Sequence, residues 1–306
     1  MPYGNIDIFG YGITTVDDLV IVANFPPPNS KQPVVKKVRQ CGGLTASALV
    51  AAARLGCGCA LSITLGEGEL SRFTRDSLVR ENLTLLESGS PENEPFHSLI
   101  ITEEGSGERS ILFDGSKSPA PAVGERDYTM LAQAKCLFTD HVYATETLPL
   151  AKKARETGKP VVGDFERHAA AVLELIDLTD HVILPLAYAA QLVGETLPEE
   201  AVSALLRKSG RSVACVTDSE RGCWWGSGEH PETIHHQPSF KCENVVDTTG
   251  CGDVFHGAYA ASLVQGYDIG ERVRRAAAAA CLKAGKIGAQ AGAPTKAELD
   301  AFLAGR

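Results

Sequence analysis

The chain has 306 residues, enough for two average domains or for one large α/β domain with an insertion. It carries 29 Lys and Arg against 38 Asp and Glu, a net charge of −9, without a basic block, which argues against a nucleic-acid-binding surface. With 44% hydrophobic and 22% charged residues, the chain can bury a substantial core, which argues against disorder.

Short apolar runs alternate with helical patterns along the chain. This alternation predicts a doubly wound α/β fold, in which a mainly parallel sheet is flanked by helices and ligands bind beyond the carboxyl ends of the strands. The predicted strands are Ile6–Gly12, Ala60–Leu65, Cys136–Thr139, Pro160–Asp164, His181–Leu184 and Ser212–Val216. The predicted helices are Ala46–Leu55, Ser71–Arg80, Leu148–Thr157, Glu199–Lys208, Asp253–Val264, Gly270–Lys283 and Lys296–Leu303.

Two segments, residues 16–38 and 96–113, fit this alternation poorly. The first contains three consecutive prolines and looks extended, whereas the second reads as two strands around a glycine-containing turn. We expect both to pair outside the main sheet as a small β lid. Because neither has the composition of a linker, we expect one domain over residues 1–306.

The nine cysteines are scattered, and the closest pair is Cys57 and Cys59. This pattern predicts neither a disulfide framework nor a zinc site, so we expect a reducing, cytoplasmic compartment. The N-terminal residues lack the pattern of a signal peptide. Residues 42–65 contain one charge, Arg54, but a Gly-Cys-Gly run interrupts them, so they predict a helix, a turn and a strand rather than a membrane span.

The most informative run is Asp247-Thr-Thr-Gly-Cys-Gly-Asp253, which directly precedes a helical pattern. Its two glycines allow a tight turn, and the backbone N–H groups at a helix N-terminus form an anion site. Asp253 could accept a proton from a nucleophilic hydroxyl while the N–H groups take up charge on a transferring phosphoryl group. The physics alone leaves a second interpretation equally open, in which Asp253 only caps the helix.

This run resembles the D-T-x-G-A-G-D signature of the ribokinase-like (PfkB) carbohydrate kinases. Three other segments are similar to motifs of the same family, in the family's order and spacing. They are Gly12–Asp17, like the early strand with a sugar-binding Asp, Gly42–Gly56, like the G-G-x-x-x-N-x-A helix, and Val216–Gly222, like the T-x-G-x-x-G nucleotide loop. The C-terminal half also resembles bacterial sulfofructose kinases.

The resemblance implies ATP-dependent phosphorylation of a hydroxyl group of a sugar or sugar derivative, with Mg-ATP and a small sugar-like acceptor. From the charge pattern and the interrupted apolar run, we expect no nucleic acid and no membrane as partner. It implies that Asp253 is the general base and that Gly250, Cys251 and Gly252 form the anion hole. The implied acceptor pocket has Asp17, Gly42, Gly43 and Ser47, and the implied nucleotide site has Thr217, Ser219 and Gly222. Asp247 and Thr249 match positions that bind a monovalent cation such as K⁺ in some members, with residues 286–292 completing that site, and a homodimer through the lid is also implied.

Four departures from the family pattern matter for the chemistry. Cys251 stands where the family has Ala, Ser47 where it has Asn, and Ser219 where it has Gly. The N-x-x-E motif, which helps to organise Mg²⁺, is missing from residues 184–194. We therefore expect an acceptor pocket unlike that of ribokinase and a Mg²⁺ ion held mainly by the nucleotide phosphates.

Two alternatives remain open from the sequence. The first is a nucleoside kinase of the adenosine-kinase type, and the second is a catalytically weak sugar- or nucleotide-binding protein of the same fold. The missing N-x-x-E motif supports the second, and the intact Asp253 opposes it. His256 could orient Asp253, although a structural role is the better interpretation of this histidine. We expect Trp224 and Trp225 to have a packing role.

Overall fold

The computed structural model describes residues 5–105, 108–208, 211–242 and 244–306. Its strands are β1 (Ile8–Tyr11), β2 (Thr15–Val22), β3 (Lys36–Gly42), β4 (Cys59–Thr64), β5 (Thr84–Ser88), β6 (Phe96–Glu103), β7 (Arg109–Asp114), β8 (Cys136–Asp140), β9 (Val161–Asp164), β10 (His181–Pro185), β11 (Val213–Thr217), β12 (Cys223–Ser227) and β13 (His230–Gln237). Its helices are α1 (Leu44–Arg54), α2 (Glu69–Arg80), α3 (Glu125–Gln133), α4 (Ala144–Glu156), α5 (Ala170–Asp177), α6 (Leu186–Val193), α7 (Pro198–Lys208), α8 (Cys251–Val264), α9 (Ile269–Ala284), α10 (Ala289–Gly292) and α11 (Lys296–Ala304).

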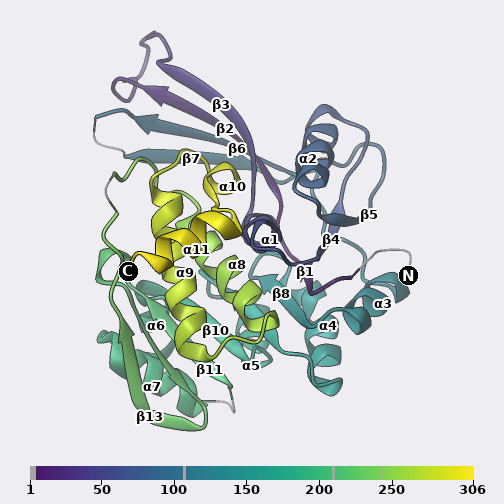
Figure 1. The fold of residues 1–306 in the computed structure, drawn as a ribbon. Coiled ribbons are helices and arrows are strands. Elements are labelled where there is room, and N and C mark those ends of the chain that lie inside the picture. The colour runs from purple at the N-terminus through teal and green to yellow at the C-terminus, as the bar shows by residue number, and fades with distance from the viewer. Residues whose placement is uncertain (1–4, 106–107, 209–210, 243) are drawn as a thin grey trace.

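The main sheet has the strand order β13-β12-β11-β10-β9-β8-β1-β4-β5 (Figure 1). It is parallel from β11 to β5, and only β12 and β13 are antiparallel within the part of the chain that the structure describes. One apolar core lies between the sheet and α1, α8, α9 and α11, and a second lies between its other face and α3 to α7. The doubly wound α/β fold is therefore confirmed.

A second sheet, with the order β3-β2-β6-β7, projects from the main body and lies at the top of Figure 1. Its strands come from the two segments that we expected to form a lid, of which residues 106 and 107 lie outside the described residues. Leu112 and Phe113 on β7 are each 61% exposed, so this sheet offers uncovered apolar surface. A role as a lid over substrate and a homodimer through it stay predictions.

The predicted strands and helices are present, with ends that differ by a few residues. The largest difference is α4, which we expected to begin at Leu148. The helix begins at Ala144 instead, and the Thr147 side chain donates to Tyr143 O at 2.7 Å in this first turn. The sequence patterns did not predict β5 or the helices α3, α5, α6 and α10, most of which are short.

Residues 42–65 form the end of β3, then α1, a turn and β4, as the Gly-Cys-Gly interruption predicts. Within the described ranges, no helix is both long enough and apolar enough to cross a membrane.

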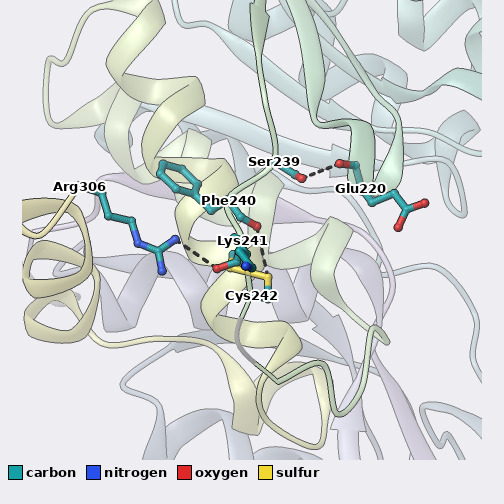
Figure 2. The surroundings of a disulfide bond; sticks show 7 residues. Glu220, Ser239, Phe240, Lys241, Cys242 and Arg306 are labelled. Carbon is teal, nitrogen blue, oxygen red and sulfur yellow. Dashed lines mark hydrogen bonds between the residues drawn. A yellow bond between two sulfur atoms is a disulfide. The ribbon is translucent and has the colours of Figure 1, made fainter.

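Cys242 and Cys281 are bonded as a disulfide, with their Cα atoms 5.7 Å apart (Figure 2). The scattered cysteines gave no indication of this pair, because its members lie 39 residues apart and meet only through the packing of α9. The residues around Cys242 also link neighbouring segments, since Ser239 Oγ donates to Glu220 O and Arg306 donates to Lys241 O. The segment before Asp247 is thus attached both to α9 and to the loop after β11.

Helices α1 and α8 pack with their backbones in contact. Helix α1 is rich in Ala, α8 contains Ala and two Gly residues, and Gly257 of α8 faces the Ala48 carbonyl of α1. A Cβ atom at position 257 would lie 2.1 Å from Ala48 O and 2.8 Å from Ala48 C. Because a carbonyl oxygen cannot rotate away as a side chain can, only glycine fits at this crossing.

We predict that Gly257→Ala lowers the free energy of unfolding by about 2 kcal/mol, because overpacking outweighs the gain of up to about 1 kcal/mol in helix propensity. The matched control is Gly270→Ala in α9, where the nearest atom to a new Cβ would be 3.5 Å away. Chemical denaturation of both variants measures the difference. Equal stabilities for the two variants would contradict the close packing of α1 and α8.

Candidate active site

The site lies at the carboxyl ends of β1, β8 and β9, where the strand order changes direction and α8 begins. Asp140, the last residue of β8, is fully buried there and organises this edge. Its Oδ2 atom accepts hydrogen bonds from Ile13 N at 2.7 Å and from Thr45 Oγ1 at 2.6 Å, and its Oδ1 accepts from Val142 N at 2.8 Å. Asp140 thereby joins the ends of β1 and β8 to the first turn of α1.

The predicted anion hole lies at the start of α8. Gly250 is the N-cap residue with φ 78°, a left-handed conformation that favours glycine, and Gly252 is exposed in the first turn. The Cys251 N–H donates to Thr248 O at 3.2 Å. The N–H groups of Gly250, Gly252 and Asp253 donate to no acceptor in the described residues, so they are the donors that an anion can use.

Asp253 is partly buried at the same end of α8. Burial, followed by the negative charge of Asp164, raises the pKa of Asp253 well above its usual range, and the neighbouring His256 opposes this shift. A carboxyl group with a raised pKa is a better proton acceptor than an ordinary surface aspartate once it is ionised. The arrangement combines a proton acceptor with donors for a developing negative charge.

His256 contacts three oxygen atoms from three elements. Its Nδ1 atom lies 2.8 Å from Gly252 O and 3.4 Å from Asp164 Oδ2, and its Nε2 atom lies 3.1 Å from Ile183 O. The ring therefore has partners at both nitrogens, as expected for a structural histidine. It also fixes the first turn of α8 against β9 and β10, and so holds the predicted anion hole in place.

The four residues predicted for the acceptor pocket come from β2, β3 and α1. Asp17 Oδ1 accepts from Thr15 Oγ1 at 2.9 Å, and burial raises the pKa of Asp17 against the opposing effect of its hydrogen bonds. Gly42 leaves room for this carboxylate, because a Cβ there would lie 2.2 Å from Asp17 Oδ2. Gly43, with φ 94°, caps α1 next to the Ile13 carbonyl.

Ser47 and Thr14 are buried hydroxyl groups without a hydrogen-bond partner among the described residues. A buried hydroxyl without a partner costs free energy, so it indicates that a ligand or water completes the hydrogen bond. Thr14 also lines a small pocket together with Gly12, Ser118 and Tyr143. These two hydroxyls are therefore candidate ligand contacts, with Thr14 just after the end of β1 and Ser47 on α1.

The residues predicted for the nucleotide lie around the loop that follows β11. Thr217 ends β11, Ser219 has φ 46°, and Gly222 has φ 92°. A Cβ at position 222 would lie 2.1 Å from Gln237 O, so glycine is required there, whereas Ser219 occupies a left-handed conformation despite its side chain. This loop is therefore a sharp turn between β11 and β12.

Trp224 and Trp225 lie on adjacent positions of β12, and each stacks on a histidine of β13. The ring centroids are 4.1 Å apart for Trp224 and His236, and 4.3 Å apart for Trp225 and His235. The two histidines face opposite sides of the strand, as the alternation of side chains predicts. The packing role expected for both tryptophans is confirmed.

Asp247 and Thr249, predicted to hold a monovalent cation, lie beside the connection between α9 and α10. Asp247 Oδ1 accepts from Thr249 N and Asp247 Oδ2 accepts from Gly288 N, each at 2.8 Å. Burial alone raises the pKa of Asp247, but these hydrogen bonds and the charge of Lys283 together lower it. The Lys283 ammonium group is fully buried and donates to Asp247 O at 2.6 Å.

Sequence reasoning missed Asp140, Asp164 and Lys283. Asp140 and Asp164 each end a buried strand of the parallel sheet, which is a signal that could have identified them. Lys283 lies in an alanine-rich helix, and nothing in the sequence distinguishes it from a solvated lysine. The region of the missing N-x-x-E motif, residues 184–194, forms the end of β10 and the whole of α6. The described residues contain no group of three or more side chains that could hold a metal ion.

Comparisons with known proteins bear on the fold and on the family resemblance. A family model described as pfkB family carbohydrate kinase matches residues 6–296. The ribokinase of Haemophilus influenzae is 26% identical over 95% of this chain and 96% of its own length, and that of Lactococcus lactis is 27% identical over 86% and 85%. The structure of Arabidopsis thaliana ribokinase complexed with ribose and ATP has a TM-score of 0.84 at 20% identity, covering 97% of this chain and 98% of the other.

We predict that Asp140→Ala lowers the free energy of unfolding by about 3 kcal/mol or more, because it leaves the donors of Ile13, Thr45 and Val142 without an acceptor. Asp140→Asn, which keeps one acceptor oxygen, should cost roughly half as much. Denaturant unfolding provides the measurement, with the exposed Asp76→Ala as the control. Wild-type stability for Asp140→Ala would show that these hydrogen bonds do not hold the edge together.

Proposed function

This chain belongs to the pfkB family of carbohydrate kinases, and on that premise we propose that it transfers the γ-phosphoryl group of ATP to a hydroxyl group of a sugar or sugar derivative. The observation that carries the proposal is the start of α8. The backbone N–H groups at this helix start that have no acceptor among the described residues adjoin Asp253. Burial and the negative charge of Asp164 raise the pKa of Asp253. Phosphoryl transfer requires both elements, a proton acceptor and donors for the transferring group.

In the proposed reaction, Asp253 accepts the proton of the acceptor hydroxyl. The hydroxyl oxygen forms a bond to the γ-phosphorus, the bond from this phosphorus to the bridging oxygen breaks, and ADP leaves with that electron pair. The N–H groups of Gly250 and Gly252 stabilise the negative charge on the transferring group. The N–H group of Cys251 joins them when its hydrogen bond to Thr248 O is broken. Thr217, Ser219 and Gly222 place the nucleotide.

Mg²⁺ enters this proposal with the nucleotide. The described residues contain no group of three or more side chains that could hold a metal ion. Residues 184–194 contain no Asp or Glu, which fits an ion held mainly by the ATP phosphates. When bound, the ion neutralises phosphate charge during the transfer.

The proposed acceptor pocket is polar. Besides Gly42 and Gly43, it contains the carboxylate of Asp17 and the hydroxyl of Ser47, which has no hydrogen-bond partner among the described residues. Carboxylate and hydroxyl groups suit a ligand that presents several hydroxyls. Phe96 and Phe113 of the second sheet lie with ring centroids 6.4 Å apart, and Phe113 is exposed. A nucleoside base can stack on such an aromatic pair, so the test also includes nucleosides as acceptors.

The test is ADP release from Mg-ATP with a panel of ketoses, aldoses, sugar acids, sulfosugars and nucleosides. Turnover with one of the sugar classes is the expected result. Turnover with nucleosides alone would replace the proposal by the nucleoside-kinase alternative. Tight binding of ATP and a sugar without turnover would support the binding-protein alternative.

We predict that Asp253→Asn lowers kcat by about 10²–10⁴, the usual contribution of a general base. The KM for ATP should change little, because the amide keeps the size of the side chain and the N–H donors are unaffected. Steady-state kinetics with the best acceptor measures both constants, and circular dichroism confirms folding. A folded Asn variant with a near-wild-type kcat would exclude the base role.

We predict that Asp17→Asn raises the KM of the acceptor by about 10–100-fold, the range expected when a hydrogen bond to a charged group is lost. The KM for ATP should stay within about twofold, because Asp17 lies on β2 and the nucleotide loop follows β11. Both constants come from the same assay. An equal rise in both would place Asp17 outside the acceptor pocket.

A further inference from the structure

Lys283 lies where the family resemblance implies a monovalent cation. It is the penultimate residue of α9, and it is fully buried. Its Nζ atom lies 2.6 Å from Asp247 O, 3.2 Å from Lys286 O and 3.5 Å from Asp247 Oδ2. All three contacts are oxygen atoms, two carbonyls and one carboxylate.

This donor set matches the three hydrogens of an ammonium group. An ammonium group has three N–H donors and no acceptor, and here it meets three acceptors without an intervening donor. The aliphatic part of the Lys283 side chain also packs closely against α10. A Cβ atom at Gly292 would lie 3.1 Å from Lys283 Cε, so the glycine leaves just enough room for it. The charge of Lys283 is therefore placed by packing along the whole side chain.

The oxygens that Lys283 uses belong to the segments expected to ligate an external ion. Asp247 was predicted as a ligand, and Lys286 begins the loop predicted to complete the site. A K⁺ ion at this position would need the same oxygen atoms and would be repelled by the buried ammonium group. The residues present therefore do not fit an external monovalent cation while Lys283 holds its position.

The contacts of Lys283 also bear on the anion hole. Asp247 precedes Gly250 by three residues, and its backbone N–H donates to Ala284 O at 3.1 Å. Gly250 lies against α10, since a Cβ there would be 2.4 Å from Ala289 Cβ. Lys283 thus holds together the segment that leads into the anion hole and the connection between α9 and α10.

We propose that the buried ammonium group of Lys283 is a built-in replacement for a monovalent cation, so that turnover does not depend on K⁺. In this role Lys283 is a positioning residue for the anion hole. The part of the proposal that concerns turnover rests on the proposed kinase activity, whereas the replacement of the ion can be tested on the folded protein alone.

The first experiment needs no variant. The kcat of the wild-type enzyme is measured in KCl, NaCl and choline chloride at equal ionic strength, and it should agree within about twofold between the three salts. Activation of the wild-type enzyme several-fold by K⁺ over choline would overturn the proposal.

The second experiment uses Lys283→Met, which keeps an unbranched apolar side chain as far as Cε and removes the charged amino group. In choline chloride its kcat should fall by about tenfold or more, the effect of losing charge-assisted hydrogen bonds. Addition of KCl or NH₄Cl should restore part of this loss in a saturable manner. The matched control is Lys296→Met on α11, an exposed lysine paired with Asp300, which should match the wild-type enzyme in every salt.

A third measurement is independent of activity. The Tm of Lys283→Met should rise with KCl relative to choline chloride, whereas the Tm of the wild-type protein and of Lys296→Met should not. If no acceptor is turned over by any of these proteins, the kinase proposal fails and this measurement still tests the inference. A Lys283→Met protein that shows no K⁺ response in either kcat or Tm, or that does not fold at any K⁺ concentration, would make Lys283 a structural residue only.

Discussion

Gly257 of α8 lies against the Ala48 carbonyl of α1, and the geometry of the candidate site depends on this contact. Helix α1 carries Ser47 next to Gly43, and α8 carries Asp253 at its first turn. Because the two helices meet through their backbones, with room for no methyl group, rotamer changes cannot alter the distance between them. The helix crossing therefore sets the distance between the proposed acceptor pocket and the proposed base. The side chains contribute the functional groups at the two ends of this distance.

The carboxylates at the carboxyl edge of the sheet divide into two kinds. Asp140 accepts three hydrogen bonds and is a structural residue, because a buried charge is tolerated only when its oxygens are satisfied. Asp253 has no such set of donors among the described residues, and burial together with Asp164 raises its pKa. The contrast between a carboxylate whose oxygens are satisfied and a partly buried one with a raised pKa supports the proposed role of Asp253 as the proton acceptor. His256 moderates this arrangement, since it contacts Asp164 and opposes the shift at Asp253.

Periodicity and motif chemistry predict different parts of this protein. The alternation of apolar runs and helical patterns predicts the parallel sheet and both helical layers, because those runs are fully buried strands such as β8 and β9. The run Asp247–Asp253 predicts the start of α8 to within two residues. The sequence does not predict contacts between distant segments. The Cys242–Cys281 pair and the burial of Lys283 both depend on how α9 packs, and no local pattern encodes that packing.

The placement of Lys283 changes how Asp247 is understood. The partly buried carboxylate of Asp247 and the buried ammonium group of Lys283 compensate each other, so the removal of either partner is costly while the pair is tolerated. The contact with Lys283 is therefore a sufficient reason for an aspartate at position 247, and no external ion is needed to explain it. An ion that exchanges with solvent stabilises its site only in proportion to its concentration, whereas a side chain tethered to α9 is always present. The order of the segment that leads into Gly250 then depends on the packing of α9, and no longer on the salt around the protein.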